Sequence, residues 1–339
     1  MPLLSDSSYA APSWLPGGHV QTIFPSLLRR LPDLPFERTH IPTPDGDRIV
    51  LDMLRAGAKQ SRSVVILSHG LEGNSRRKYM RGMCRMFAAE GWDSVARNFR
   101  GCGGEPNLTP GLYHSGQTID LHTVVLHCLL LGYERIALLG FSMGGNQTLK
   151  YLGENPGRVP AQVVAAAAFS VPCDLPGAAR VLDQPGNVVY MRYFLRSLRE
   201  KVRQKHALYP ELYPLEGLAA MRTFAEFDGQ YTAKIHGFAS ARDYWERAAC
   251  LPHLPHIAVP SLLVNARNDP FLSEGCYPVD AARQSRFLSL EMPDSGGHVG
   301  FTSRLGEAAY WSEIRATEFF RQYLGRRPST SVQSTPAHD

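Results

Sequence analysis

The sequence lacks several features that mark other classes of protein. Its six cysteines are scattered and none forms a Cys-x-x-Cys pair, so neither a zinc ribbon nor a redox dithiol is indicated. The N-terminus has no basic start followed by an apolar core, unlike a secretory signal. No run approaches the about 18 apolar residues that a membrane helix needs. We therefore expect a cytoplasmic protein with reduced cysteines and no transmembrane segment.

A strong bias of charge is also absent. The 36 basic and 31 acidic residues give a formal net charge of +5, and the two signs are interleaved over most of the chain. Nucleic-acid binding needs basic residues gathered on one face, so we expect no nucleic-acid partner. Residues 326–339 are polar and rich in Pro, Ser and Thr, which is typical of a disordered tail.

The chain does contain a regular alternation of short apolar segments and longer segments with helical periodicity. Strands are expected at residues 63–70, 93–101, 135–142, 161–172, 260–269 and 286–294. The segments between most of them, and the closing segment 308–325, are expected to be helices. Strands that are apolar on both faces predict a mostly parallel central sheet with helices on both faces. We expect one α/β domain over residues 1–325.

Residues 174–250 interrupt this alternation, because they contain no clear strand. We expect them to form a helical cap inserted into the domain. Within it, residues 187–206 place five apolar side chains on one helical face and most of their arginines and lysines elsewhere. Two interpretations stay open: a helix with a solvated outer face, or a lid whose basic surface meets lipid or an anionic substrate.

The segment LLGFSMGGN, residues 138–146, contains a Gly-x-Ser-x-Gly motif centred on Ser142. It follows an expected strand and precedes an expected helix, which is the context that this motif requires. Small residues two positions before and after the serine allow a tight turn that exposes its hydroxyl. The N–H groups at the start of the next helix favour negative charge there. We predict Ser142 as a catalytic nucleophile.

A nucleophilic serine needs a base, and the base needs an orienting acid. In this type of fold the acid and then the histidine follow the serine along the chain. His298 comes after the last expected strand, and Asp269 ends the strand before it, so we predict these two residues as base and acid. Asp174 and Asp294 are alternatives for the acid, and the strand–loop context favours Asp269.

The tetrapeptide Gly-Gly-His-Val occurs twice, at residues 17–20 and 296–299. Chain order separates the two copies, because His19 precedes the nucleophile and the whole expected sheet. We expect His19 to pack structurally or to line the edge of a pocket.

The tetrahedral oxyanion formed during ester cleavage needs two backbone N–H donors. Met143, directly after the nucleophile, and Leu71, after the strand 63–70, are the expected donors. His69 is expected to hold its own loop through a hydrogen bond, and Arg100 to anchor the loop in which it lies. This chemistry requires no metal and no organic cofactor.

Eight motifs occur in a characteristic order: SWLPGGHVQTIFPSL, HGLEGNS, NFRGCGGEPN, YHSGQTIDL, GFSMGGN, FDGQYTAKIHGF, DYWERA and SGGHVGF. Together they resemble the YheT-like α/β-hydrolases, which are related to plant embryogenesis-associated hydrolases and to animal α/β-hydrolase domain proteins. The resemblance spans residues 13–324. It implies an α/β-hydrolase fold with a cap and a triad of Ser142, Asp269 and His298. It also implies hydrolysis of short- to medium-chain acyl esters or acylglycerols, and hence a role in lipid metabolism.

The sequence therefore predicts a serine carboxylic ester hydrolase with a small-molecule acyl ester as substrate. Two alternatives stay open. The same triad serves an acyltransferase or a thioesterase, and the fold also serves as a non-catalytic binding protein. A haloalkane dehalogenase or an epoxide hydrolase is disfavoured, because those enzymes need Asp where Ser142 stands.

Overall fold

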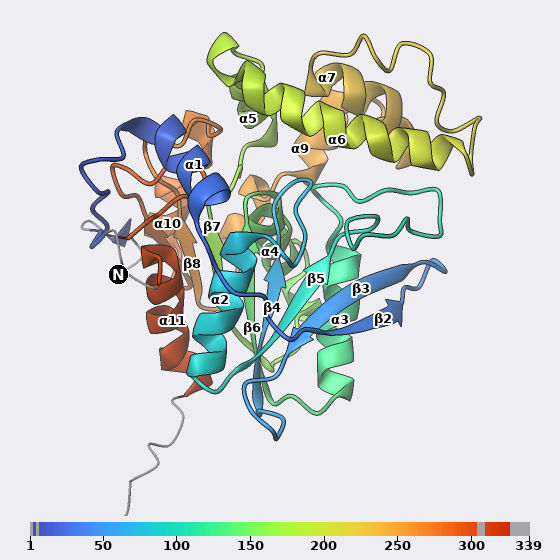
Figure 1. Ribbon diagram of the computed structural model, residues 1–339. Coiled ribbons are helices and arrows are strands. Elements are labelled where there is room, and N and C mark those ends of the chain that lie inside the picture. Colours follow the sequence, from blue (N-terminus) through green and yellow to red (C-terminus); the bar gives the residue numbers. More distant parts are fainter. Residues whose placement is uncertain (1–2, 5–6, 304–308, 326–339) are drawn as a thin grey trace, which may run out of the picture.

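The computed structural model of this protein describes residues 3–4, 7–303 and 309–325. The expected tail at 326–339 lies outside the described residues. A central sheet of nine described strands has the order β1-β9-β8-β7-β6-β4-β5-β3-β2 (Figure 1). All neighbouring pairs are parallel except β2 with β3 and β3 with β5. The predicted mostly parallel sheet is confirmed.

Six of these strands are the expected ones, with shorter bounds: β4 (Ser63–Ser68), β5 (Asp93–Asn98), β6 (Arg135–Phe141), β7 (Val163–Phe169), β8 (Ser261–Val264) and β9 (Leu288–Glu291). Three strands were not expected: the edge strands β1 (Leu3–Leu4) and β2 (Glu37–Pro42), and β3 (Arg48–Leu54), which lies between β2 and β5. Strand β2 is largely exposed and polar, so it carries little of the hydrophobic signal by which a buried strand is recognised.

Helices cover both faces of the sheet, and alternate residues of one central strand show why both faces are apolar. Val64 and Ile66 of β4 face a core shared with α3 (Thr118–Leu130), α4 (Met143–Glu154) and α10 (Val279–Gln284). Val65 and Leu67 face a second core shared with α2 (Lys78–Ala89) and α11 (Trp311–Leu324). A strand buried on both faces reads as a continuous apolar run, which is the pattern that predicted it.

A set of helices lies between β7 and β8 in the chain and above the carboxyl ends of the strands (Figure 1). It comprises α5 (Leu175–Leu182), α6 (Val188–His206), α7 (Phe224–Phe227), α8 (Ala233–Ile235) and α9 (Ala241–Ala248), with a π-helical turn at Asp228–Thr232. This cap has its own hydrophobic cluster, in which Leu195, Leu198 and Val202 of α6 pack with aromatic side chains of α7 and the π-turn.

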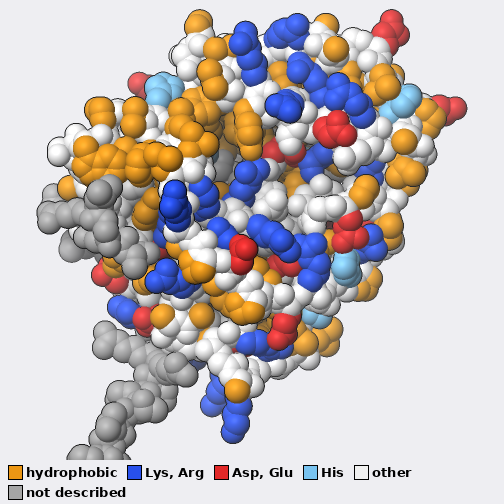
Figure 2. All heavy atoms as spheres, in the orientation of Figure 1, with side chains coloured by type: hydrophobic (Ala, Val, Ile, Leu, Met, Phe, Trp, Pro, Cys, Tyr) orange, Lys and Arg blue, Asp and Glu red, His pale blue; other side chains and the backbone are white. Residues whose placement is uncertain are grey.

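Two basic residues expected on the outer face of α6 are buried instead. Lys201 Nζ donates to the carbonyl of Gly101, and Lys205 Nζ donates to the carbonyl of Asn107. These bonds fasten the cap to loops of the sheet domain, and their long-range partners could not be read from helical periodicity. Other basic side chains of the cap remain outside, where Figure 2 shows Lys and Arg gathered over its surface. 

No helix in the described part of the chain combines the length and apolarity that crossing a membrane requires. All six cysteines are buried and free, so the fold has no disulfide between them.

A buried ion pair joins the segment after α1 (Gly17–Leu28) to α11. Arg29 Nη2 lies 2.8 Å from Glu313 Oε2, and the Arg29 guanidinium lies 3.7 Å from the centroid of the Tyr310 ring. Gly82 of α2 leaves the space for this pair, because a Cβ there would stand 1.8 Å from Glu313 Oε1.

We expect Gly82→Ala to lower the free energy of unfolding by about 3 kcal/mol, the range for disrupting a buried ion pair. Urea denaturation measures this loss. Gly186→Ala is the matched control, since no atom beyond the neighbouring residues of the chain lies within 4 Å of the Cβ position at Gly186. Equal stability of the two variants would contradict the role assigned to Gly82.

Candidate active site

Ser142 lies on the sharp turn between β6 and α4, with φ 52° and ψ −120°. Positive φ is unfavourable for a residue with a side chain, and two glycines make the turn possible. A Cβ at Gly140 would lie 2.4 Å from the carbonyl oxygen of Gly144, and a Cβ at Gly144 would lie 2.4 Å from that of Ser68. The Gly-x-Ser-x-Gly motif thus forms the predicted strand–turn–helix.

The structure brings Ser142, His298 and Asp269 into one hydrogen-bonded line. His298 Nε2 lies 2.9 Å from Ser142 Oγ, and His298 Nδ1 lies 2.8 Å from Asp269 Oδ2. The Asp269 side chain is fully buried in the loop after β8, and its Oδ1 also accepts a hydrogen bond from the N–H of Phe271. This geometry allows the imidazole to take a proton from the serine while the carboxylate fixes its orientation.

The two alternative acids have other partners. Asp174 caps α5 by accepting from the N–H of Gly177, and it also accepts from the Ser273 hydroxyl. The Asp294 side chain is 98% exposed and pairs with Arg267 at 3.5 Å. Neither arrangement resembles the buried contact between Asp269 and His298.

Leu71 and Met143, the expected oxyanion donors, line the same cavity as Ser142 and His298. The loop of Leu71 lies directly against Ser142, because a Cβ at Gly70 would stand 3.2 Å from Ser142 Cβ. His69 holds this loop as expected: its Nδ1 lies 2.7 Å from the Gly70 carbonyl oxygen, and its Nε2 accepts from the N–H of Phe99. Burial lowers the pKa of His69 to about 3, so the ring is neutral and suited to both bonds.

Arg100 anchors its loop, as expected. The buried guanidinium donates to Asp120 at 2.9 and 2.7 Å and to Asp45 at 2.6 and 3.1 Å. Asp47 lies 3.4 Å from the guanidinium as a third carboxylate. The pKa of Asp45 is lowered chiefly by its hydrogen bond with Arg100.

The loop that carries His298 is held by side chains from other parts of the chain. Four consecutive backbone N–H groups each donate to a side-chain oxygen at 2.8 to 3.0 Å: Gly296 to Gln21 Oε1, Gly297 to Asn268 Oδ1, His298 to Thr22 Oγ1, and Val299 to Ser170 Oγ. Such donors need partners when they are removed from water. The four acceptors therefore fix the backbone on which the candidate base stands.

Two of these acceptors belong to α1, which carries the first Gly-Gly-His-Val copy. The two copies touch, because a Cβ at Gly297 would lie 2.6 Å from the carbonyl oxygen of Gly18. His19 itself points to the cap, where its Nδ1 lies 3.2 Å from the Tyr190 hydroxyl. The positioning roles of Gln21 and Thr22 were not predicted from the sequence. The one signal for them was their place directly after the first copy of the repeated tetrapeptide.

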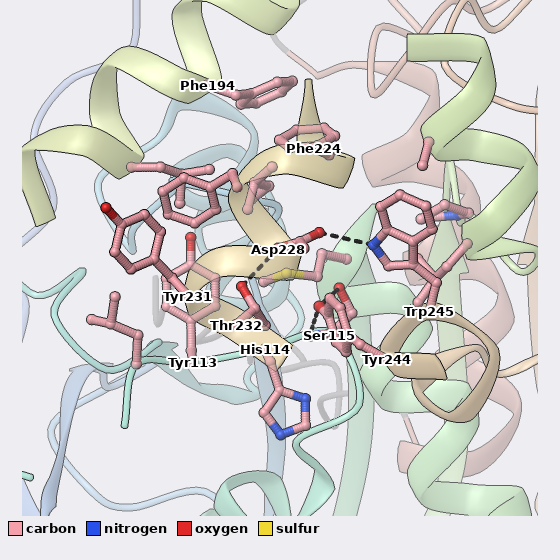
Figure 3. Close-up of a pocket in the computed structure, with 18 of the residues that line it drawn as sticks. Tyr113, His114, Ser115, Phe194, Phe224, Asp228, Tyr231, Thr232, Tyr244 and Trp245 are labelled. Atoms are coloured by element: carbon pink, nitrogen blue, oxygen red, sulfur yellow. Dashed lines mark hydrogen bonds between the residues drawn. The ribbon is translucent and has the colours of Figure 1, made fainter. Parts of the chain in front are cut away.

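A cavity that opens to solvent lies between Ser142 and the cap. Its walls are mainly apolar and aromatic, with Phe194, Phe224 and Tyr231 on the cap side (Figure 3). Among the described residues, no group of three or more His, Cys, Asp or Glu side chains is arranged to hold a metal ion.

Comparisons with known proteins agree with this architecture. The model of a family described as the alpha/beta hydrolase fold matches residues 63–304. The chain is 33% identical to the putative esterase YheT of Escherichia coli strain K12, over 90% of this chain and 91% of that protein. It is 29% identical to the phospholipase ABHD3 of Homo sapiens, over 88% of this chain and 75% of that protein. An esterase structure from Pyrococcus furiosus, 19% identical, superposes with a TM-score of 0.58 over 86% of this chain and 92% of that one.

We expect Gln21→Leu to lower the free energy of unfolding by about 2 kcal/mol or more. The change leaves the Gly296 N–H and the Asn268 amide without the acceptor that they share, and each buried unsatisfied donor costs about 1–3 kcal/mol. Urea denaturation provides the measurement. Ser26→Ala in the same helix is the control, because the exposed Ser26 hydroxyl bonds only within α1. A Gln21→Leu protein as stable as this control would show that the Gln21 acceptor is not needed for stability.

Proposed function

Because this chain belongs to the α/β-hydrolase fold family, as a relative of YheT, we propose that it is a serine carboxylic ester hydrolase with a triad of Ser142, His298 and Asp269. The observation that carries the proposal is the line of hydrogen bonds from Ser142 Oγ through the two ring nitrogens of His298 to the Asp269 carboxylate. The strained backbone of Ser142 adds support, since such conformations gather at functional sites.

In the proposed reaction, Ser142 Oγ attacks the ester carbonyl while His298 Nε2 accepts its proton. Asp269 stabilises the resulting imidazolium. The N–H groups of Leu71 and Met143 hold the oxyanion of the tetrahedral intermediate. The intermediate collapses, and His298 delivers the proton to the leaving alcohol. Water then attacks the acyl-enzyme by the reverse sequence, with His298 again as base.

The cavity supports an acyl ester as substrate. Its walls next to Ser142 include Leu71 and Phe271, and those of the cap include Phe194 and Leu198. An apolar pocket with a few polar groups suits a small-molecule acyl chain. We therefore propose short- to medium-chain acyl esters, acylglycerols among them, as substrates, with a role in lipid metabolism.

We expect hydrolysis of p-nitrophenyl esters of graded chain length to fall by about 10⁴-fold or more in Ser142→Ala, the scale of losing a triad serine. A fluorophosphonate probe should label the unmodified protein and leave Ser142→Ala unlabelled. Ser26→Ala serves as the control serine. Equal hydrolysis by Ser142→Ala and the unmodified protein would refute the proposed mechanism, and absence of labelling would favour a binding protein. Product analysis with competing alcohols would reveal acyl transfer.

The two copies of Gly-Gly-His-Val offer a matched pair of histidines. We expect His298→Ala to lose at least about 10³-fold in kcat, because the general base is gone. A folded His19→Ala protein should retain most activity, since His19 contacts the Tyr190 hydroxyl at the cap surface. Steady-state kinetics of both variants on one ester measure the two losses of kcat. Comparable losses would contradict the assignment of His298, and not His19, as the general base.

A further inference from the structure

Three motifs of the sequence take no part in the proposed triad, yet their side chains meet in one wall of the cavity. Asp228 and Thr232 come from the π-turn, Tyr244 and Trp245 from α9, and Ser115 from the loop before α3 (Figure 3). All five line the cavity that also contains Ser142. We call this group the polar wall.

The Asp228 carboxylate accepts hydrogen bonds from two neutral donors. Thr232 Oγ1 donates to its Oδ1 at 2.7 Å, and Trp245 Nε1 donates to its Oδ2 at 2.8 Å. No Lys, Arg or His in the described part of the chain forms an ion pair with it. Carboxylate oxygens have about four acceptor sites between them, so Asp228 retains capacity for a donor brought by a ligand.

The buried position of Asp228 disfavours its charged form. Burial raises the pKa of this carboxyl to about 6, because removal from water disfavours the charged form. The π-turn places Asp228 and Thr232 one turn apart, and π-helical turns are rare and frequent at functional sites. A carboxylate that faces an aromatic cavity, with only neutral hydrogen-bond donors beside it, is therefore a feature that a purely structural wall does not need.

Ser115 supplies a hydrogen-bond donor to the wall, which complements the Asp228 acceptor. Its N–H donates to the Tyr244 hydroxyl, and that hydroxyl donates to Ser115 Oγ, both at 2.9 Å. The Ser115 hydroxyl is thus left with its own hydrogen to donate. Burial is the main cause of the raised pKa of the Tyr244 phenol, and the charge of the nearby Asp228 is the second cause. The polar wall thus combines an acceptor and a donor.

We infer that the polar wall binds a free hydroxyl group of the ester substrate, at a position remote from the scissile carbonyl. A hydroxyl both donates, to Asp228, and accepts, from Ser115, whereas an ammonium group only donates. This inference rests on the proposed function, since it takes the cavity to be that of an ester hydrolase. The hydroxyl belongs either to the alcohol portion or to the acyl portion of the ester.

The test compares kcat/KM for two pairs of esters. Propyl and 2,3-dihydroxypropyl octanoate place the hydroxyls on the alcohol, and methyl octanoate and methyl 8-hydroxyoctanoate place it on the acyl chain. We expect the unmodified protein to prefer the hydroxylated ester of one pair by about 10- to 100-fold, the scale of a hydrogen bond to a charged group. The pair that shows the preference identifies the portion that the wall holds.

In Asp228→Leu the preference for the hydroxylated ester of that pair over the plain ester should fall to within about twofold. Asp228→Asn, which keeps the side-chain shape, should give an intermediate preference and guards against loss of folding in the leucine variant. Glu246→Gln is the control, since Glu246 lies exposed on α9, the helix that carries Tyr244 and Trp245, and pairs with Arg242. A merely structural role for Asp228 would lower the rates on both esters together and leave the preference unchanged.

The inference is overturned if the unmodified protein shows no preference in either pair, or if the preference survives in Asp228→Leu. It is also overturned if an octanoate ester of choline, which carries no hydroxyl, is preferred over the dihydroxypropyl ester. Calorimetric binding of the same esters to the Ser142→Ala protein gives this comparison without turnover. Failure of all esters to react would overturn the proposed function, whereas the binding comparison would still decide the role of the polar wall.

Discussion

The candidate site depends on a loop that is itself neither helix nor strand and is held by side chains of other segments. Residues 296–299 carry the proposed base, and their four successive N–H groups find acceptors only in side chains of other segments. Val299 adopts φ 57°, an unfavourable conformation for a β-branched residue. The acceptors from α1 and from the loops after β7 and β8 offset that strain and set the direction of the imidazole.

The proposed nucleophile, Ser142, is positioned by a different principle. Its strained turn is stabilised by close backbone contacts at Gly140 and Gly144, within the buried junction of β6 and α4. The motif that forms this turn is local, in five consecutive residues. The loop of the proposed base, in contrast, depends on contacts between residues far apart in the chain. The proposed triad joins one element of each kind, with His298 between Ser142 and the buried Asp269.

This contrast explains what could be predicted from the sequence. The six central strands are buried on both faces, so their apolar runs identified them, and chain order then selected Asp269 and His298. Strand β2 and helix α1 were missed, because β2 is polar and exposed and α1 begins with two glycines and contains Pro25. The burial of Lys201 and Lys205 depends on carbonyl groups about 100 residues away, and no local pattern encodes such partners. The positioning roles of Gln21 and Thr22 were missed for the same reason.

The bond between the Thr22 hydroxyl and the His298 N–H spans 276 positions of sequence. A contact between residues so far apart forms only after the chain has lost the conformational entropy of closing a long loop. The position of the proposed base is therefore linked to residues near the start of the chain. Without α1 beside it, the loop of His298 would lose two of its four side-chain acceptors.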